Sequence, residues 1–409
     1  MEKHQNLSQN TAKVLVKCFF ILFSFFMLFI ESEIKDVNIL KVFIVVQICL
    51  ITCYIYIKVG LLSPIGIFWG MLCFFYYNRI LFNILGLMKY ESGNFFDMSS
   101  LSVSSQIESL YTFSYSLLAF LLAILVKLSS YSPKFNFLEN GELYYISNKI
   151  YKIIIIISFY FLVKEAQLIM KSGYISIYSD FVYRGLAQKL FLNLPLILYC
   201  VNISTGYKSK IFIQNTILMF IFLCVDLIKG DRSLGMSVCL MIICYYSNVV
   251  RKNSRIKVLW IFIVGLILSI LSIIIGMIRG KENIILSKVL GNISVFFTSQ
   301  TITGSLVGKA IEYKNFLYGN INIFVNLSKE VFKSSVDSTG NFETLISKTL
   351  NKNLFDIGFG LDGNPFAELY IYTKNIYLFF ISLVLVYMII LILIDQSKKS
   401  WVRMSLFFT

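Results

Sequence analysis

The sequence predicts an all-α polytopic membrane protein with about ten transmembrane helices. Hydrophobic residues make up 57% of the 409-residue chain and charged residues only 14%. Soluble proteins carry about 25% charged residues. Apolar runs also recur along the chain, most of them near the roughly 20 residues that cross a bilayer. Together these two features predict a membrane fold rather than a set of soluble domains.

Taken in order, the apolar runs predict nine spans in residues 1–278 and one in 375–394. Residues 1–12 are polar, and no small-residue cleavage site follows the first run, so that run is interpreted as an uncleaved anchor. Residues 279–374 form a large loop and 395–409 a tail. The ten predicted spans are 13–30, 37–57, 61–88, 107–128, 150–170, 189–203, 210–228, 233–250, 258–278 and 375–394.

The basic residues predict the orientation of these spans. Lys and Arg are concentrated in alternate short connections, and such connections stay in the cytoplasm. Both termini are therefore expected inside, with the loop 279–374 outside. The net charge of +15 then reflects topology and attraction to anionic lipid headgroups. No Arg-rich arm or basic helix indicates nucleic-acid binding.

The large loop of about 96 residues contains several glycines and many apolar and aromatic residues. This content argues against disorder. Three amphipathic stretches, at 286–297, 306–316 and 342–354, predict short interfacial helices folded over the mouth of the membrane part. Nothing in the loop indicates a soluble catalytic domain.

No cofactor or metal site is predicted. The eight cysteines lie in apolar runs without a paired CxxC spacing, and the only histidine is His4. They are interpreted as small hydrophobic residues. Walker A, GxGxxG, HExxH and GxSxG motifs do not occur, which disfavours an ATP-driven pump and the common soluble enzymes.

A dense group of charges lies between the seventh and eighth predicted spans. Asp226, Lys229, Asp231 and Arg232 fall within seven positions. Charges near membrane depth are costly and usually face a cavity or partner. One interpretation is the floor of a site for an anionic, membrane-borne substrate. The alternative is a hairpin tip whose charges are all solvated.

Three arginines follow one pattern. Arg184, Arg232 and Arg279 each lie near the predicted outer end of a span and close to a glycine. Guanidinium groups match phosphate oxygens bidentately, so the three could hold a pyrophosphate. Alternatively they anchor helix ends. Arg79, inside an apolar run, is a further candidate, although it could simply reach toward the headgroups.

Acidic side chains on the predicted outer side are candidates for accepting a proton from a hydroxyl group. Tyr370 and Tyr372, next to one of these carboxylates, could stack on a sugar or belong to an aromatic belt. The acidic candidates are Asp226, Asp231, Glu282, Glu312, Asp362 and Glu368.

The chain resembles the Wzy-type O-antigen polymerases, an architecture of ten or more spans with one large periplasmic loop late in the chain. Four short motifs carry the resemblance. These are Lys229-Gly230-Asp231-Arg232-Ser233, Met277-Ile278-Arg279-Gly280-Lys281, Gly304-Ser305-Leu306 and Asn364-Pro365-Phe366-Ala367-Glu368-Leu369-Tyr370.

The resemblance implies a membrane fold like that of the lipid-dependent glycosyltransferases. It implies polymerisation of undecaprenyl-pyrophosphate-linked oligosaccharides on the periplasmic face of the inner membrane, without a nucleotide. Arg232 and Arg279 by motif, and Arg184 by position, would bind the pyrophosphate, and Glu368 or Asp231 would accept the proton. A chain-length regulator protein is a further partner that it suggests.

Two departures and two alternatives accompany this resemblance. The Arg-x10-Gly spacing of some members is not met, since Gly291 lies one step late after Arg279 and Pro195 follows Arg184. The periplasmic histidine of the related ligases is missing. A flippase for the same lipid-linked unit and a surface-glycan ligase are the alternative functions.

The predicted topology can be tested by labelling single cysteines with an impermeant reagent, after replacement of the native cysteines. Cysteines at Ser100, Ser233 and Ser338 should react from the periplasm, and those at Ser130 and Ser254 should not. Labelling at Ser254 without labelling at Ser338 would show that the map is inverted in this part of the chain.

Overall fold

The computed structural model is all-helical in the residues it describes, and it has no strand among them. The described residues are 33–77, 80–81, 101–127, 140–172, 186–206, 208–229, 242–247, 302–320, 342–350 and 365–397, with single positions at 22, 26, 29, 30, 238, 270, 273, 274 and 277. Five of the described helices are long and apolar enough to cross a membrane. A polytopic membrane architecture is therefore confirmed, and the total of ten spans stays a prediction.

The long helices agree closely with the apolar runs of the sequence. The second, fourth, fifth, sixth, seventh and tenth runs correspond to helices, while the first, eighth and ninth lie largely outside the described residues. The helices are α2 (Val37–Lys58), α5 (Val103–Lys127), α6 (Gly141–Ser172), α8 (Leu186–Thr205), α9 (Ser209–Lys229) and α19 (Ile376–Ser397).

The third run begins differently from a continuous span. Helix α3 (Pro64–Leu72) passes directly into a π-helical turn, η1 (Cys73–Tyr77). The Ser63 side chain caps α3 by accepting from the Gly66 N–H at 3.1 Å, with Pro64 at the first helical position. Proline suits that position because its missing N–H would have no helical partner there.

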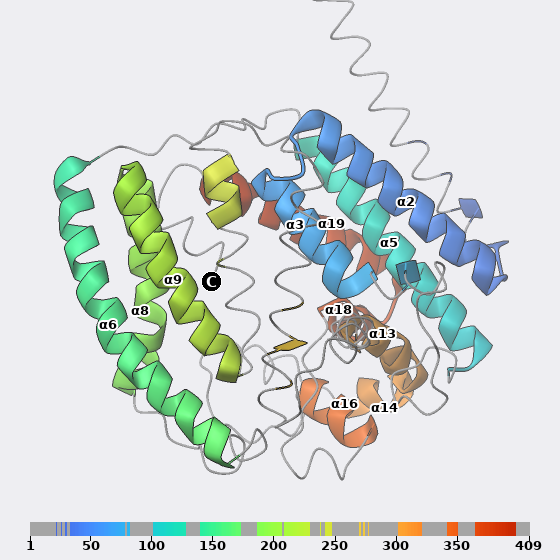
Figure 1. Ribbon diagram of the computed structural model, residues 1–409. Coiled ribbons are helices and arrows are strands. Elements are labelled where there is room, and N and C mark those ends of the chain that lie inside the picture. The colour runs from blue at the N-terminus through green and yellow to red at the C-terminus, as the bar shows by residue number, and fades with distance from the viewer. Residues whose placement is uncertain are drawn as a thin grey trace, which may run out of the picture.

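The helices form two groups, which are separate in Figure 1. One contains α2, α3, α5 and α19, and α5 is at its centre. In the most apolar part of α5, 83% of the residues are buried, against 33% in α2 and 22% in α19. The outer helices leave apolar faces exposed, as expected of helices in contact with lipid.

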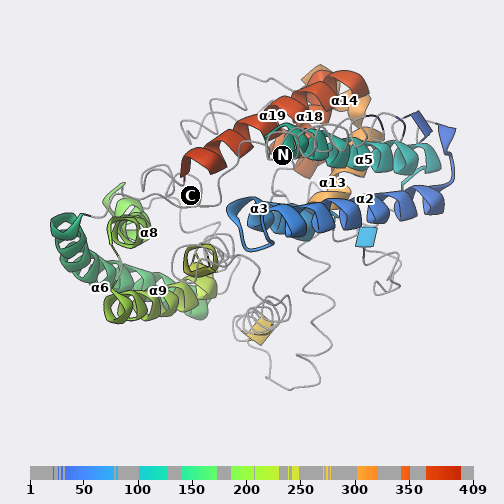
Figure 2. The same ribbon diagram turned by 90° about the horizontal axis from the view of Figure 1, so that it is seen from above.

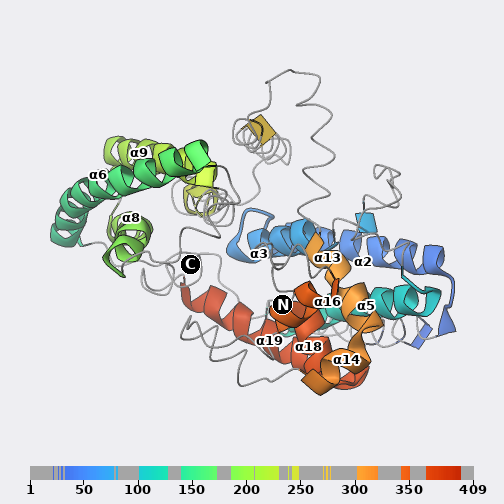
Figure 3. The same cartoon turned by 90° about the horizontal axis from the view of Figure 1, so that it is seen from below.

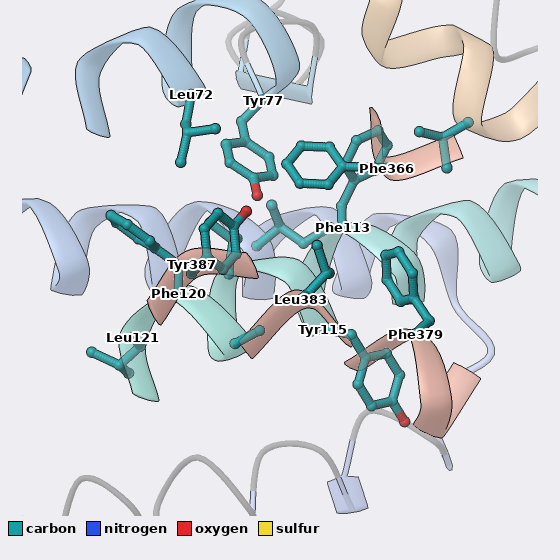
Figure 4. Packing of buried hydrophobic residues seen from close by; sticks show 14 of the residues in the cluster. Leu72, Tyr77, Phe113, Tyr115, Phe120, Leu121, Phe366, Phe379, Leu383 and Tyr387 are labelled. Atoms are coloured by element: carbon teal, nitrogen blue, oxygen red, sulfur yellow. The ribbon is translucent and has the colours of Figure 1, made fainter. Parts of the chain in front are cut away.

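Aromatic rings fill the space between α3, α5 and α19 (Figure 4). Phe120 of α5 stacks on Trp69 at 5.1 Å between ring centroids and meets the edge of Tyr387 at the same distance. The polar atoms of two rings are satisfied inside the protein. Trp69 Nε1 donates to Thr52 Oγ1 at 2.9 Å, and Tyr77 Oη lies 2.5 Å from Ser116 Oγ.

The second group, α6, α8 and α9, is joined by amide side chains. Asn215 Nδ2 of α9 donates to Asn148 Oδ1 of α6 at 2.9 Å and to Asn202 Oδ1 of α8 at 3.0 Å. Tyr151 Oη donates to the carbonyl of Asn215 at 2.9 Å. Polar bonds of this kind hold helices together in membranes, where apolar contact alone does not favour helix over lipid.

Helix directions within each group agree with the predicted alternation of spans. Along α5 and α19, Tyr115 contacts Phe380 and Phe120 contacts Tyr387, so these helices are parallel. In the other group, the Asn140 N–H beside the start of α6 donates to Thr205 O at the end of α8. Helices α6 and α8 are therefore antiparallel, as two consecutive spans must be.

Gly66 provides a test of the turn that starts α3. A Cβ atom there would lie 2.4 Å from the Leu61 carbonyl oxygen and 2.6 Å from that of Gly60, and neither backbone group can move aside easily. We expect Gly66→Ala to destabilise the protein by about 1–3 kcal/mol through overpacking. The measurement is thermal unfolding of the full chain in detergent.

Gly70 of the same helix is the matched control, because a Cβ atom there would have nothing within 4 Å. Gly70→Ala should leave the unfolding temperature unchanged or raise it slightly, since alanine favours helix. Equal behaviour of the two variants would contradict the described turn.

Candidate functional site

Four short helices of the large loop pack onto the α2–α3–α5–α19 group. They are α13 (Ile302–Glu312), α14 (Lys314–Asn320), α16 (Phe342–Leu350) and α18 (Pro365–Thr373). Figures 2 and 3 show α13, α14 and α18 beside α5 and α19. Their buried residues belong to the same hydrophobic core as those of α2, α5 and α19.

The predicted amphipathic stretches are only partly reproduced. Residues 306–316 cover the end of α13 and the start of α14, with Tyr313 between the two helices, and 342–354 contains α16. The stretch 286–297 lies outside the described residues. Helix α18 is a further helix that periodicity did not indicate.

Helix α18 has a clear beginning, buried face and end. It starts at Pro365, and the ring of Phe366 packs edge-on against Tyr76 of η1 at 4.7 Å. It ends where Lys374 adopts a left-handed conformation, with φ of 55°, and donates its N–H to Tyr370 O at 3.1 Å. This is the single-bond left-handed cap of many helix C-termini, usually made with glycine.

Glu108, at the N-terminal end of α5, is the centre of a polar cluster made by this packing. Lys314 Nζ of α14 lies 2.8 Å from Glu108 Oε1 and 3.0 Å from Oε2. The Tyr370 hydroxyl of α18 donates to Glu108 Oε1. We call Glu108, Lys314 and Tyr370 the glutamate cluster.

The two tyrosines near Glu108 remain protonated. The pKa of Tyr370 is raised well above its ordinary value, first by burial and then by the hydrogen bond to Glu108 and its negative charge. The pKa of Tyr318 is also raised, mainly by burial. Lys374 Nζ lies 5.3 Å from the centre of the Tyr318 ring, within cation–π range. Tyr370 therefore acts as a hydrogen-bond donor in the cluster.

The ion pair itself contributes little to stability. The side chains of Lys314 and Glu108 are 35% and 30% exposed, and exposed pairs are worth about 0–1 kcal/mol. The apolar contacts around Phe366 and Tyr370 thus hold the loop helices in place, and the glutamate cluster refines their position.

Glu368, the predicted proton acceptor, lies two residues before Tyr370 on α18. It is half-buried, on a helix whose Phe366 ring packs against Tyr76 of η1. Predicted candidates Glu368 and Tyr370 are thus brought to one short helix next to the membrane helices. A half-buried carboxylate in such a place can accept a proton from a hydroxyl group.

Asp226, another predicted candidate, is in the second helix group and only 3% exposed in α9. The alternative in which water solvates all charges of this hairpin is therefore wrong for Asp226. Glu165 of α6 is also buried, at 1% exposure. Buried membrane carboxylates usually have a functional or pairing role. The position of Glu165 inside an apolar run was the signal for it in the sequence.

The remaining candidates lie outside the described residues, so their proposed roles stay predictions. They are Arg79, Arg184, Asp231, Arg232, Arg279, Glu282 and Asp362. The candidate Glu312 is described: it ends α13 and pairs with Lys309 at 3.0 Å. In the part of the chain that the structure describes, no three His, Cys, Asp or Glu side chains could hold a metal ion. The functional groups in and around the glutamate cluster are carboxylates, phenols and an amine.

One model of a known protein family matches nearly the whole chain. The family model described as O-antigen polysaccharide polymerase Wzy matches residues 15–409. The chain belongs to this family. No curated protein and no solved structure matches it. Within this Wzy chain the matched residues include both helix groups and all four loop helices, so the polar cluster is part of the family region.

Sequence reasoning missed Glu108 and Lys314 of the Wzy chain. Glu108 is the second residue of the apolar run 107–128 and lies in the second turn of α5, which begins at Val103. Its two partners are 206 and 262 residues away. The only available signal was an acidic residue at the predicted outer end of a span.

Glu368→Gln tests the assignment of the proton acceptor. Glutamine keeps the shape of the side chain but cannot accept a proton at neutral pH, so we expect normal expression and membrane insertion with a short or missing polysaccharide ladder. General base catalysis is typically worth about 10²–10⁴-fold in rate. A ladder of normal length would move the assignment to Asp231 or Glu282.

Proposed function

We propose that the chain polymerises undecaprenyl-pyrophosphate-linked oligosaccharide repeat units into O antigen or a related surface polysaccharide, on the periplasmic face of the inner membrane. Membership of the Wzy family establishes repeat-unit polymerisation as its general activity. The observation that carries the proposed site is the packing of α18, with Glu368 and Tyr370, against η1 and α5.

The reaction moves a growing glycan from its carrier to the next lipid-linked unit. The bond between the anomeric carbon and the carrier pyrophosphate breaks, and a bond to the acceptor hydroxyl oxygen forms. The hydroxyl proton goes to a carboxylate, Glu368 or Asp231 in our assignment. The pyrophosphate leaves on the lipid carrier, and a nucleotide is not needed.

The leaving pyrophosphate needs cations in the headgroup region. We assign this role to Arg232, Arg279 and Arg184, because the guanidinium fork binds phosphate oxygens bidentately. Arg79, Asp226, Glu282 and Tyr370 are further members of the proposed site. Tyr370 would then position α18 through Glu108, as its hydrogen bond indicates.

The proposed orientation places both termini in the cytoplasm and the loop helices in the periplasm. It is supported by the distribution of basic residues and by the helix directions. Helices α13, α14 and α18 contact the N-terminal part of α5, which is the predicted outer end of that span. A chain-length regulator protein is the partner that we expect at this face.

The test is a lipopolysaccharide gel of a deletion strain of the source organism, carrying either an empty plasmid or the wild-type chain. Loss of the long ladder with one repeat unit retained, and its return with the plasmid, supports a polymerase. Loss of every repeat unit would instead identify a ligase or a flippase.

The role assigned to Arg232, Arg279 and Arg184 gives a second testable expectation about chain length. Arg232→Ala and Arg279→Ala should leave chains with one repeat unit only, because removing one partner of a desolvated charge contact typically costs about 2–5 kcal/mol. The lysine variants should be partly active, since lysine keeps the charge but loses the fork. Arg184→Ala should have the smaller effect.

Long chains from all three alanine variants, expressed at the normal level, would show that these arginines anchor helix ends. Immunoblots of the membrane fraction provide the expression control.

A further inference from the structure

We propose that Glu108 is a positioning residue of this enzyme. It fixes α14 and α18 at the N-terminal end of α5, so that Glu368 is held in its working position. This inference rests on the proposed function, because it assigns a role relative to the polymerisation site.

Three segments that are distant in sequence meet at Glu108. Its oxygens accept from Lys314 of α14 and Tyr370 of α18, which are 206 and 262 residues away in sequence. By contrast, the nearby pair of Lys309 and Glu312, at 3.0 Å, lies within a single helix. Glu108 therefore connects the membrane helix α5 to two helices of the loop.

Both oxygens of Glu108 already take part in this connection. Oε1 accepts from Lys314 and Tyr370, and Oε2 accepts from Lys314. Glu368 lies on the same short helix as Tyr370, so a shift of the Tyr370 end of α18 moves Glu368 with it. Glu108 therefore acts through α18 rather than on the sugar.

The expected effect is catalytic rather than a loss of fold. Exposed ion pairs stabilise little, and the loop helices stay attached through the core that includes Ile311, Leu317 and Phe366. Misplacing a reacting group by about 1 Å can reduce a rate about 10²-fold. We expect Glu108→Ala to form the ladder at least about tenfold more slowly at a normal expression level.

A disulfide between α5 and α13 separates positioning from direct chemistry, because α13 packs against α5 and also against both α14 and α18. A Cβ atom at Gly308 would lie 3.8 Å from Ser109 Cβ, within the range of about 3.5–4.5 Å seen in disulfides. The closest atom to it is Leu101 Cδ1 at 2.4 Å, the end of a flexible side chain that can turn away.

The experiment measures ladder formation in membrane vesicles of the deletion strain, which contain the strain's own lipid-linked repeat unit. The full-length chain, with native cysteines replaced, carries Ser109→Cys and Gly308→Cys. When oxidised, this disulfide should restore the rate of Glu108→Ala to within about threefold of the parent. Reduction should remove the gain, and Glu368→Gln should gain nothing.

The charge-swapped variant, with Glu108→Lys and Lys314→Glu together, is the test that needs no disulfide. Each single change should slow the ladder. The two together should recover only the part of the rate that depends on the ion pair to α14, because a lysine at position 108 cannot accept from the Tyr370 hydroxyl. Lys309→Gln is the matched control, because it removes an ion pair inside α13 only, and its rate should equal that of the parent.

Unchanged activity of Glu108→Ala would overturn the positioning role and leave the proposed function intact. Loss of activity that neither the disulfide nor the charge swap restores would also overturn it. If the wild-type chain forms no ladder in the deletion strain, the proposed function fails, and the positioning role fails with it.

Discussion

The burial of α5 is the constraint on which most of the described structure depends. A helix enclosed by other helices must satisfy its polar side chains within the protein, because neither water nor lipid can do so. Ser114 of α5 accepts a hydrogen bond from Gln47 Nε2 of α2 at 2.8 Å. Ser116 of α5 is hydrogen-bonded to the hydroxyl of Tyr77 in η1. These two hydrogen bonds join α5 to α2 and to η1 and so help to set the register in which these elements pack.

The same helix connects the large loop to the membrane part. Residues of α13, α14, α16 and α18 are in one hydrophobic core with α2, α5 and α19, so the loop helices are an extension of the bundle rather than a separate unit. Gly308 illustrates how close this packing is, since a Cβ atom there would meet the side chain of Leu101. A reaction site at this junction would combine rigid membrane helices with polar groups supplied by the loop.

The sequence was a good guide to local features and a poor guide to distant ones. The start of α2 follows from Asp36, whose carboxylate accepts from the N–H groups of Asn38 and Ile39, and the apolar run alone locates α9. The π-turn after Leu72 contacts α5 through Tyr77, which meets Phe113 and Ser116, and no local pattern marks it. For the site, Glu368 and Tyr370 could be chosen by type and position. Their relation to Glu108 could not, because contacts across more than 200 residues leave no periodic signal in one sequence.

The junction between α18 and α19 consists of Lys374 and Asn375 alone. Lys374 holds a left-handed backbone conformation there, which is unfavourable for a side chain with a Cβ atom, and the Asn375 side chain caps the next helix by accepting from the Tyr377 N–H at 2.8 Å. So short a connection keeps the end of α18 close to the start of α19. A tilt of α19 in response to bilayer thickness would therefore also displace the attached end of α18. The thickness of the lipid bilayer would in this way affect the position of the loop helix.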